Sequence, residues 1–318
     1  MMRKELLSKD KLVSSPASNA PIGVWTDYCE LLCISSEQNQ IDQDEISSII
    51  IKSSDFQSKD IENLPKGRKE RLTSRLEDVY AHITLRNNLL SERYPFIINS
   101  DGQLSLKNNE FSELQKLYIL LLLSSNLCYI KNYHNLTSDF EVICLLYMRR
   151  LFPSMIFKLF GSSNTNKKLT KDDCISDAKL KERMIKLSEF VSVSYKKENV
   201  ERIPDSNHGD GGLDIVGIRK MGDNRKSIPI MFGQCACSRE EWSQKQYSLN
   251  DNQWLKFLEI ISTSIQKYMF IPDWYMNSDK QLENDLDITS CVLIDRLRIM
   301  NLADESFVSN CCSIIEED

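Results

Sequence analysis

Two short segments in the second half of the chain carry side chains suited to binding a metal ion. HGDGGLDIVG, residues 208–217, places Asp214 inside an apolar run, and FGQCACS, residues 232–238, places Gln234 in a similar setting. A carboxylate in an apolar strand loses hydration that only a bound partner restores. Aspartate and glutamine oxygens are hard ligands that suit Mg²⁺ or Mn²⁺ with several retained waters. Together the two segments predict a magnesium site.

The residues between these segments predict a β-hairpin that would bring Asp214 close to Gln234. LDIVGI and IPIMFGQCAC are short apolar runs typical of strands, and the intervening RKMGDNRKS contains the Gly, Asp and Asn of a hairpin loop. An ion held between the strands would bind a scissile phosphate and activate a water molecule. Gly211 and Gly212 either form the turn into the first strand or let the backbone approach a polyanion closely.

The order of helix, GDGGLD segment, hairpin and strand ending in Gln-Cys resembles the PD-(D/E)xK nuclease superfamily, and within it the Mrr-like restriction endonucleases. The resemblance covers about residues 175–245. It implies a restriction-endonuclease-like α/β core with a mixed central sheet, in which Asp214 is the central metal ligand and Gln234 the second. It also implies an acidic ligand on the preceding helix, predicted at 176–195, where Glu189 is preferred to Glu182.

The sequence departs from this family at the third position of the Gln-x-Lys motif, which is Ala236. In the family a lysine here orients the attacking water and offsets charge on the phosphorane, and its loss lowers the rate by orders of magnitude. Lys245, shortly after the strand, either replaces that lysine or is an ordinary surface residue. Arg239 is a second candidate, although a guanidinium can only stabilise charge. His208 is either a hydrated turn residue or, with Arg239, Gly211 and Gly212, a nucleic-acid contact.

Length and apolar periodicity predict two domains after an N-terminal arm. The arm covers residues 1–22, a helical domain for partner docking or regulation covers 23–163, and the nuclease-like domain covers 164–318. Residues 111–130 and 138–152 have helical spacing, and no strand is predicted before residue 163. After the hairpin we expect a helix at 252–268, strands at 269–275 and 288–297, and a last helix at 304–316.

Charge and cysteine content constrain the partners and the compartment. The net charge is −6, yet residues 165–245 contain 16 Lys and Arg residues against 13 Asp and Glu residues. A chain this acidic would bind DNA weakly alone, which favours a homo-oligomer or a complex with an ATPase or sensor subunit. The ten cysteines and the absence of a secretory signal in MMRKELLSKDK indicate a cytoplasmic protein with reduced thiols, and no run is long enough to span a membrane. Zinc at Cys29 and Cys33, or at Cys235 and Cys237, is disfavoured because few histidines accompany them.

The sequence is compatible with three functions. The first is a Mg²⁺-dependent endodeoxyribonuclease, which the resemblance implies would be the effector of a bacterial defence against phage or plasmid DNA. The second is a catalytically inactive nuclease-fold subunit that binds nucleic acid or scaffolds a complex, which Ala236 favours. The third is a helical adaptor. The retained Asp214 and Gln234 favour the first, because an inactive site has no need of a buried acid.

Overall fold

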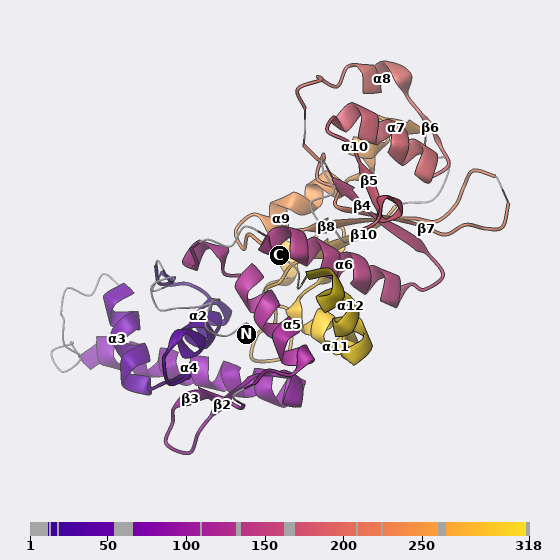
Figure 1. Ribbon diagram of the computed structural model, residues 1–318. Helices are drawn as coiled ribbons and strands as arrows, with labels where there is room; N and C mark the ends of the chain where they lie inside the picture. The colour runs from indigo at the N-terminus through magenta and orange to yellow at the C-terminus, as the bar shows by residue number, and fades with distance from the viewer. Residues whose placement is uncertain are drawn as a thin grey trace. The chain divides into compact units, whose positions relative to one another are not determined.

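The chain folds into two compact units, described here from a computed structural model (Figure 1). One unit comprises Met1–His134 with Asp273–Glu283, and the other comprises Asn135–Pro272 with Asn284–Asp318. The structure describes residues 12, 14–17, 19–53, 66–108, 110–131, 135–161, 169–207, 209–223, 225–259 and 265–315. Most of the predicted arm at residues 1–22 lies outside these ranges.

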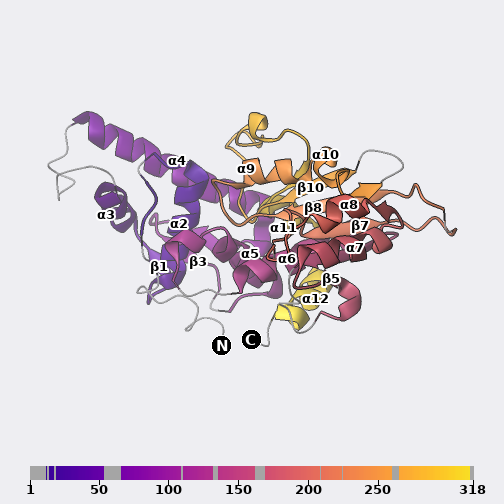
Figure 2. The ribbon, with the colours of Figure 1, turned by 90° about the horizontal axis from the view of Figure 1, so that it is seen from above.

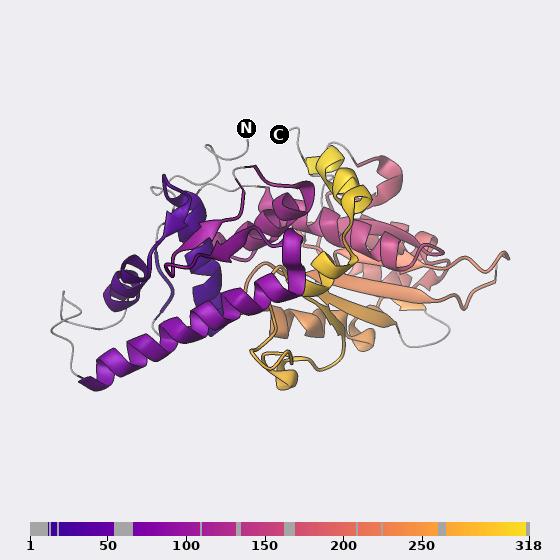
Figure 3. The same cartoon turned by 90° about the horizontal axis from the view of Figure 1, so that it is seen from below.

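The first unit is mainly helical and contains one small sheet. Its helices are α2 (Ile22–Ser35), α3 (Gln43–Ser53), α4 (Lys66–Leu90) and α5 (Glu113–Ser124), with the short turns η3 (Ser91–Arg93) and η4 (Leu127–Tyr129). Its strands are β1 (Gln40–Ile41), β2 (Phe96–Ile98) and β3 (Leu104–Leu106), paired antiparallel in the order β1-β3-β2. Figure 3 shows α4 as the longest helix of this unit.

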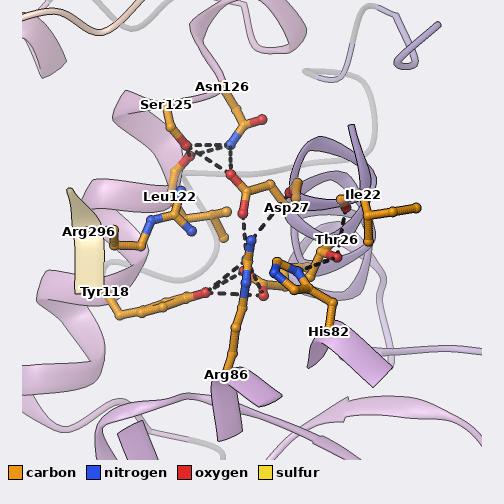
Figure 4. A network of polar contacts seen from close by, with 12 residues as sticks. Ile22, Thr26, Asp27, His82, Arg86, Tyr118, Leu122, Ser125, Asn126 and Arg296 are labelled. Atoms are coloured by element: carbon orange, nitrogen blue, oxygen red, sulfur yellow. Dashed lines mark hydrogen bonds and ion pairs between the residues drawn. The ribbon is translucent and has the colours of Figure 1, made fainter. Parts of the chain in front are cut away.

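The core of the first unit contains a buried ionic cluster (Figure 4). Arg86 of α4 lies 2.5 Å from an oxygen of Asp27 and 2.8 Å from an oxygen of Glu30, both on α2, and all three side chains are buried. The hydroxyl of Tyr118 on α5 donates to Glu30 at 2.9 Å, and the Ser125 hydroxyl donates to Asp27 at 3.1 Å. Because Asp27 and Glu30 are three residues apart on one helical face, one guanidinium reaches both. The cluster joins the three helices.

The second unit contains a mixed six-stranded sheet with helices on both faces. Its order is β11-β10-β8-β7-β4-β5, in which β7 is antiparallel to both neighbours and the remaining pairs are parallel. The strands of this sheet are β4 (Ile156–Gly161), β5 (Cys174–Ser176), β7 (Ile215–Ile218), β8 (Ile230–Cys235), β10 (Gln266–Phe270) and β11 (Val292–Ile294). A separate pair is formed by β6 (Ser194–Tyr195) and β9 (Leu258–Glu259).

Two groups of helices cover this sheet. The helix α6 (Leu136–Leu151) packs on β4 and β8 and is itself contacted by α11 (Arg296–Leu302) and α12 (Glu305–Ile315). The second group of helices packs on the sheet through an apolar core that includes Val216 and Phe232. Figure 2 shows this second group separated from α12. That group comprises α7 (Leu180–Phe190), α8 (Lys197–Glu201), α9 (Trp242–Lys245), η6 (Gln246–Leu249) and α10 (Asp251–Trp254). The short turns η5 (Lys171–Asp173) and η7 (Asp285–Asp287) complete the unit.

The mixed α/β class is confirmed, and so is the hairpin of β7 and β8. The prediction that residues before 163 form no strand is wrong, because β1, β2, β3 and β4 all precede it. The units divide at residues 134 and 135 instead of 163 and 164, since β4 hydrogen-bonds to β7 in the second unit. Residues 273–283, expected within the second domain, belong to the first unit.

The predicted helix at 252–268 is also wrong. Its first residues form α10, and its end forms β10, which lies between β8 and β11. The apolar residues of this segment are spaced for a helix, but pairing with two strands satisfies their backbone groups. Among the described residues, no helix combines the length and apolarity that crossing a bilayer requires.

Replacing Arg86 with methionine should destabilise the protein strongly. The variant leaves the carboxylates of Asp27 and Glu30 buried without their cation, a change that typically costs about 3–5 kcal/mol. Arg71→Met, at an exposed position of the same helix, should change the free energy of unfolding by no more than about 0.5 kcal/mol. Urea unfolding of both variants measures the difference, and similar losses would contradict a structural role for the cluster.

Candidate active site

Asp214 lies at the start of β7 and is held by backbone on both sides. Its amide donates to the carbonyl of Gly233 on β8 at 3.0 Å, and its carbonyl accepts from the amide of Phe160 on β4 at 2.8 Å. Its carboxylate oxygen Oδ2 accepts from the amide of Cys235 at 2.6 Å, and the residue is only 8% exposed. The predicted buried aspartate is therefore present at the edge of the sheet where β7 begins and β8 ends.

Gln234 lies across from Asp214, because Ile215 pairs with Gly233 in the antiparallel register. Its amide group faces the hydroxyl of Ser248 and the carbonyls of Gly212 and Lys245. Carbonyl oxygens only accept, so the amide nitrogen belongs on this side, where it donates to Gly212 at 3.2 Å and to Lys245 at 2.6 Å. This orientation turns Oε1 of Gln234 away from Ser248.

Ser248, which the sequence analysis did not identify, fixes the geometry around Gln234. Its hydroxyl lies 2.9 Å from the carbonyl of Gly212 and 2.7 Å from that of Lys245. A Cβ atom at Gly212, whose φ is +78°, would lie 2.3 Å from the Ser248 side chain. Glycine is therefore required at this position, both for its backbone conformation and for its contact with η6.

Two further carboxylates act on Asp214. Burial raises the pKa of Asp214 well above its usual range, and repulsion from Glu141 and Asp210 raises it further. Burial, followed by repulsion from Asp210, raises the pKa of Glu141 to about 7. Glu141 lies on α6 and Asp210 in the glycine-rich loop, where its Oδ1 accepts from the amide of Gly212 at 2.6 Å. The three carboxylates act on one another near the start of β7.

Glu141, which the sequence analysis also missed, is the helical acid that acts on Asp214, and Glu189 is not. Glu189 is exposed on α7 and is not among the charges that shift the pKa of Asp214. The sequence contained one signal for Glu141, since it is the only acid within the apolar stretch FEVICLLYM. Its relation to Asp214 depends on the packing of α6 against β4 and β8, which no local pattern specifies.

The positive charge at the site comes from α9. Lys245 is among the groups that act on Asp214, and its charge lowers the pKa of that carboxyl. Its ammonium nitrogen also lies 3.5 Å from Oε2 of Glu241. Residue 236 is a buried alanine, 2% exposed, and therefore supplies no cation. Arg239 is partly buried in the following loop, and His208 lies outside the described residues.

The cysteines of the second unit contribute to the packing near Asp214. The thiols of Cys235 and of Cys144 on α6 hydrogen-bond to each other, and burial raises the pKa of both. Cys237 lies further along the chain and is partly buried. Over the described ranges, no three His, Cys, Asp or Glu side chains lie close enough to form a ready-made metal site.

Comparison with family models, with curated proteins and with solved structures finds no match for this chain.

Glu141→Gln should flatten the pH dependence of stability in the metal-free protein. The folded pKa of about 7 exceeds the ordinary value of 4.5, so the unfolded chain loses this proton first and the free energy of unfolding falls as pH rises through that window. At pH 8 the variant should be more stable than the original by on the order of 1 kcal/mol. Urea unfolding from pH 4 to pH 8 tests this, with the exposed Glu189→Gln as the matched control. An unchanged slope in Glu141→Gln would contradict the placement of Glu141.

Proposed function

We propose that this protein is a metal-dependent endonuclease that hydrolyses phosphodiester bonds, with DNA as the substrate. The observation that carries the proposal is the buried carboxyl group of Asp214, which lies among other acids and opposite Gln234. Like charges acting on a buried carboxylate are unfavourable without a cation. A structural role alone gives no reason for three carboxylates at one end of a strand.

The residues fit a hard divalent ion that retains much of its water. Asp214 and Glu141 would provide carboxylate oxygens, and Gln234 would provide Oε1 once its amide nitrogen faces Gly212 and Lys245. Mg²⁺ commonly binds through one or two carboxylates plus waters and substrate phosphate, so a site without three preassembled ligands suits it. When bound, such an ion supplies charge neutralisation for the phosphate and a water of lowered pKa.

The side chains of the chain itself have separate roles in this proposal. Asp214 and Glu141 would bind the divalent ion and orient its waters. Their raised pKa values favour retention of their protons until the ion arrives. Lys245 is the cation whose charge lowers the pKa of Asp214. It would stabilise negative charge on the phosphate. Ser248 and Gly212 hold the amide of Gln234 in place. Without the metal, the protonated carboxyl groups would offer the phosphate no positive charge.

A catalytically inactive subunit that binds nucleic acid is the second candidate. Two observations favour it, the buried Ala236 directly after β8 and the ion pair that engages Lys245 with Glu241. The net charge of −6 disfavours tight DNA binding by one chain alone, which supports action within a homo-oligomer or a larger complex.

Cleavage of supercoiled plasmid in Mg²⁺ and in Mn²⁺ tests the first candidate. Asp214→Asn should lower the rate at least about 10³-fold because it removes a charge that acts on the reacting groups. Glu141→Gln should also lower the rate, whereas Glu189→Gln should leave it unchanged. Should the protein bind DNA but cut neither DNA nor RNA with either metal, alone or as part of a native complex, the second candidate replaces the first.

Lys245→Met should reduce the cleavage rate by about 10²–10³-fold with little change in affinity for DNA, as expected when one charge-stabilising donor is lost. Lys256→Met, at an exposed lysine of the same unit, is the control. Single-turnover rates and binding isotherms separate the two effects. A Lys245→Met enzyme with the original rate would assign Lys245 to the surface.

A further inference from the structure

The loop of the β7–β8 hairpin is strongly basic and exposed. Within residues 219–227, four cations accompany one acid, and all five of these side chains are exposed; they are Arg219, Lys220, Asp223, Arg225 and Lys226. We call residues 219–227 the basic arm. Its charge is opposite in sign to the net charge of −6 of the whole chain.

Over its described residues, 219–223 and 225–227, the arm extends the hairpin of β7 and β8. The amide of Arg219 donates to the carbonyl of Pro229 at 3.2 Å, which continues the strand pairing. Gly222 has a φ of +82°, which suits the reversal of the chain. The ammonium group of Lys226 donates to the hydroxyl of Ser194 on β6 at 2.9 Å and fixes one side of the arm. Figures 1 and 2 show the arm projecting beyond the helices of its unit.

The charges of the arm are largely uncompensated. Asp223 forms an ion pair with Arg225 at 2.6 Å, and this pair neutralises itself. Neither Arg219 nor Lys220 forms an ion pair with any residue in the described ranges. Met221 is 58% exposed between them and the turn. A projecting, unneutralised cationic surface suits a polyanion.

The arm lies at the other end of β7 from Asp214. Arg219 lies five positions after Asp214, which corresponds to about 17 Å along an extended strand. In duplex DNA the same distance corresponds to about five base pairs at roughly 3.4 Å each. One duplex lying along this direction would therefore meet both the candidate active site and the arm.

We propose that the basic arm binds the phosphate backbone of the nucleic-acid substrate about five base pairs from the bond that is cut. This inference rests on the proposed function and adds a second point of contact to it. Phosphate contacts position a protein on a duplex without reading its sequence. The arm would set the register of the duplex on the active site and would add affinity only to substrates long enough to reach it.

Binding is best measured with Asp214→Asn protein, which should bind without cutting. The arm variant combines Arg219→Gln, Lys220→Gln and Lys226→Gln. The matched control combines Arg71→Gln, Lys131→Gln and Lys280→Gln, which removes the same charges from exposed positions of the first unit. Fluorescence anisotropy with 30-bp and 8-bp duplexes over a range of salt concentrations gives affinity and salt dependence.

The arm variant should bind the 30-bp duplex about 10- to 100-fold more weakly at 0.1 M salt, and the slope of log affinity against log salt should fall by about two to three. The 8-bp duplex, roughly 27 Å long, reaches both the site and the arm in only some of its registers and should lose less affinity, and the control variant should behave like Asp214→Asn alone. Equal slopes for the arm variant and its control would overturn the arm proposal and leave the proposed function standing. A change of oligomeric state in sedimentation, with unchanged DNA binding, would overturn it in favour of a protein contact. No binding by any protein would remove the nucleic-acid function itself.

Discussion

The buried carboxylate of Asp214 is the constraint on which the second unit depends. An acid at this level of burial favours its protonated form unless something stabilises its charge, and its backbone groups are already used by β4 and β8. The amide of Cys235 is a single donor to it, while Glu141 and Asp210 repel it. This arrangement is poorly satisfied by the protein alone, which is why a cation gives the simplest account of it.

The neighbouring residues maintain that arrangement. Gly212 allows the loop to approach η6, and Ser248 connects this loop to Gln234. Trp254 contributes to the same support, since its indole nitrogen donates to the carbonyl of Ser248 at 2.9 Å and its ring packs against Phe232. The apolar core beneath the site thus determines where polar groups at the end of the sheet are presented.

The first unit uses buried charge differently. Its carboxylates at Asp27 and Glu30 share the guanidinium of Arg86, and tyrosine and serine hydroxyls satisfy further oxygen positions. A network in which both carboxylates are paired and hydrogen-bonded fixes which helices pack together. The contrast with Asp214 is informative, because the chain can neutralise buried acids where stability requires it and does not do so at the end of β7.

Local sequence was enough to predict the hairpin, its buried Asp214 and the facing Gln234, because turn residues and apolar runs act over a few positions. It was also enough to predict α7 and the helix at the end of the chain, whose periodicity agrees with their packing. The tertiary structure decided the rest: that Glu141 acts on Asp214, that Ser248 holds Gln234, where β4 lies in the sheet, and that the chain divides at residue 135. Each of these depends on contacts between segments distant in sequence, where strand pairing outweighs local propensity. Glu189 is an example. It is an acid on the helix before the hairpin, as predicted, but it is exposed to solvent, and the acid that acts on Asp214 is Glu141 on α6.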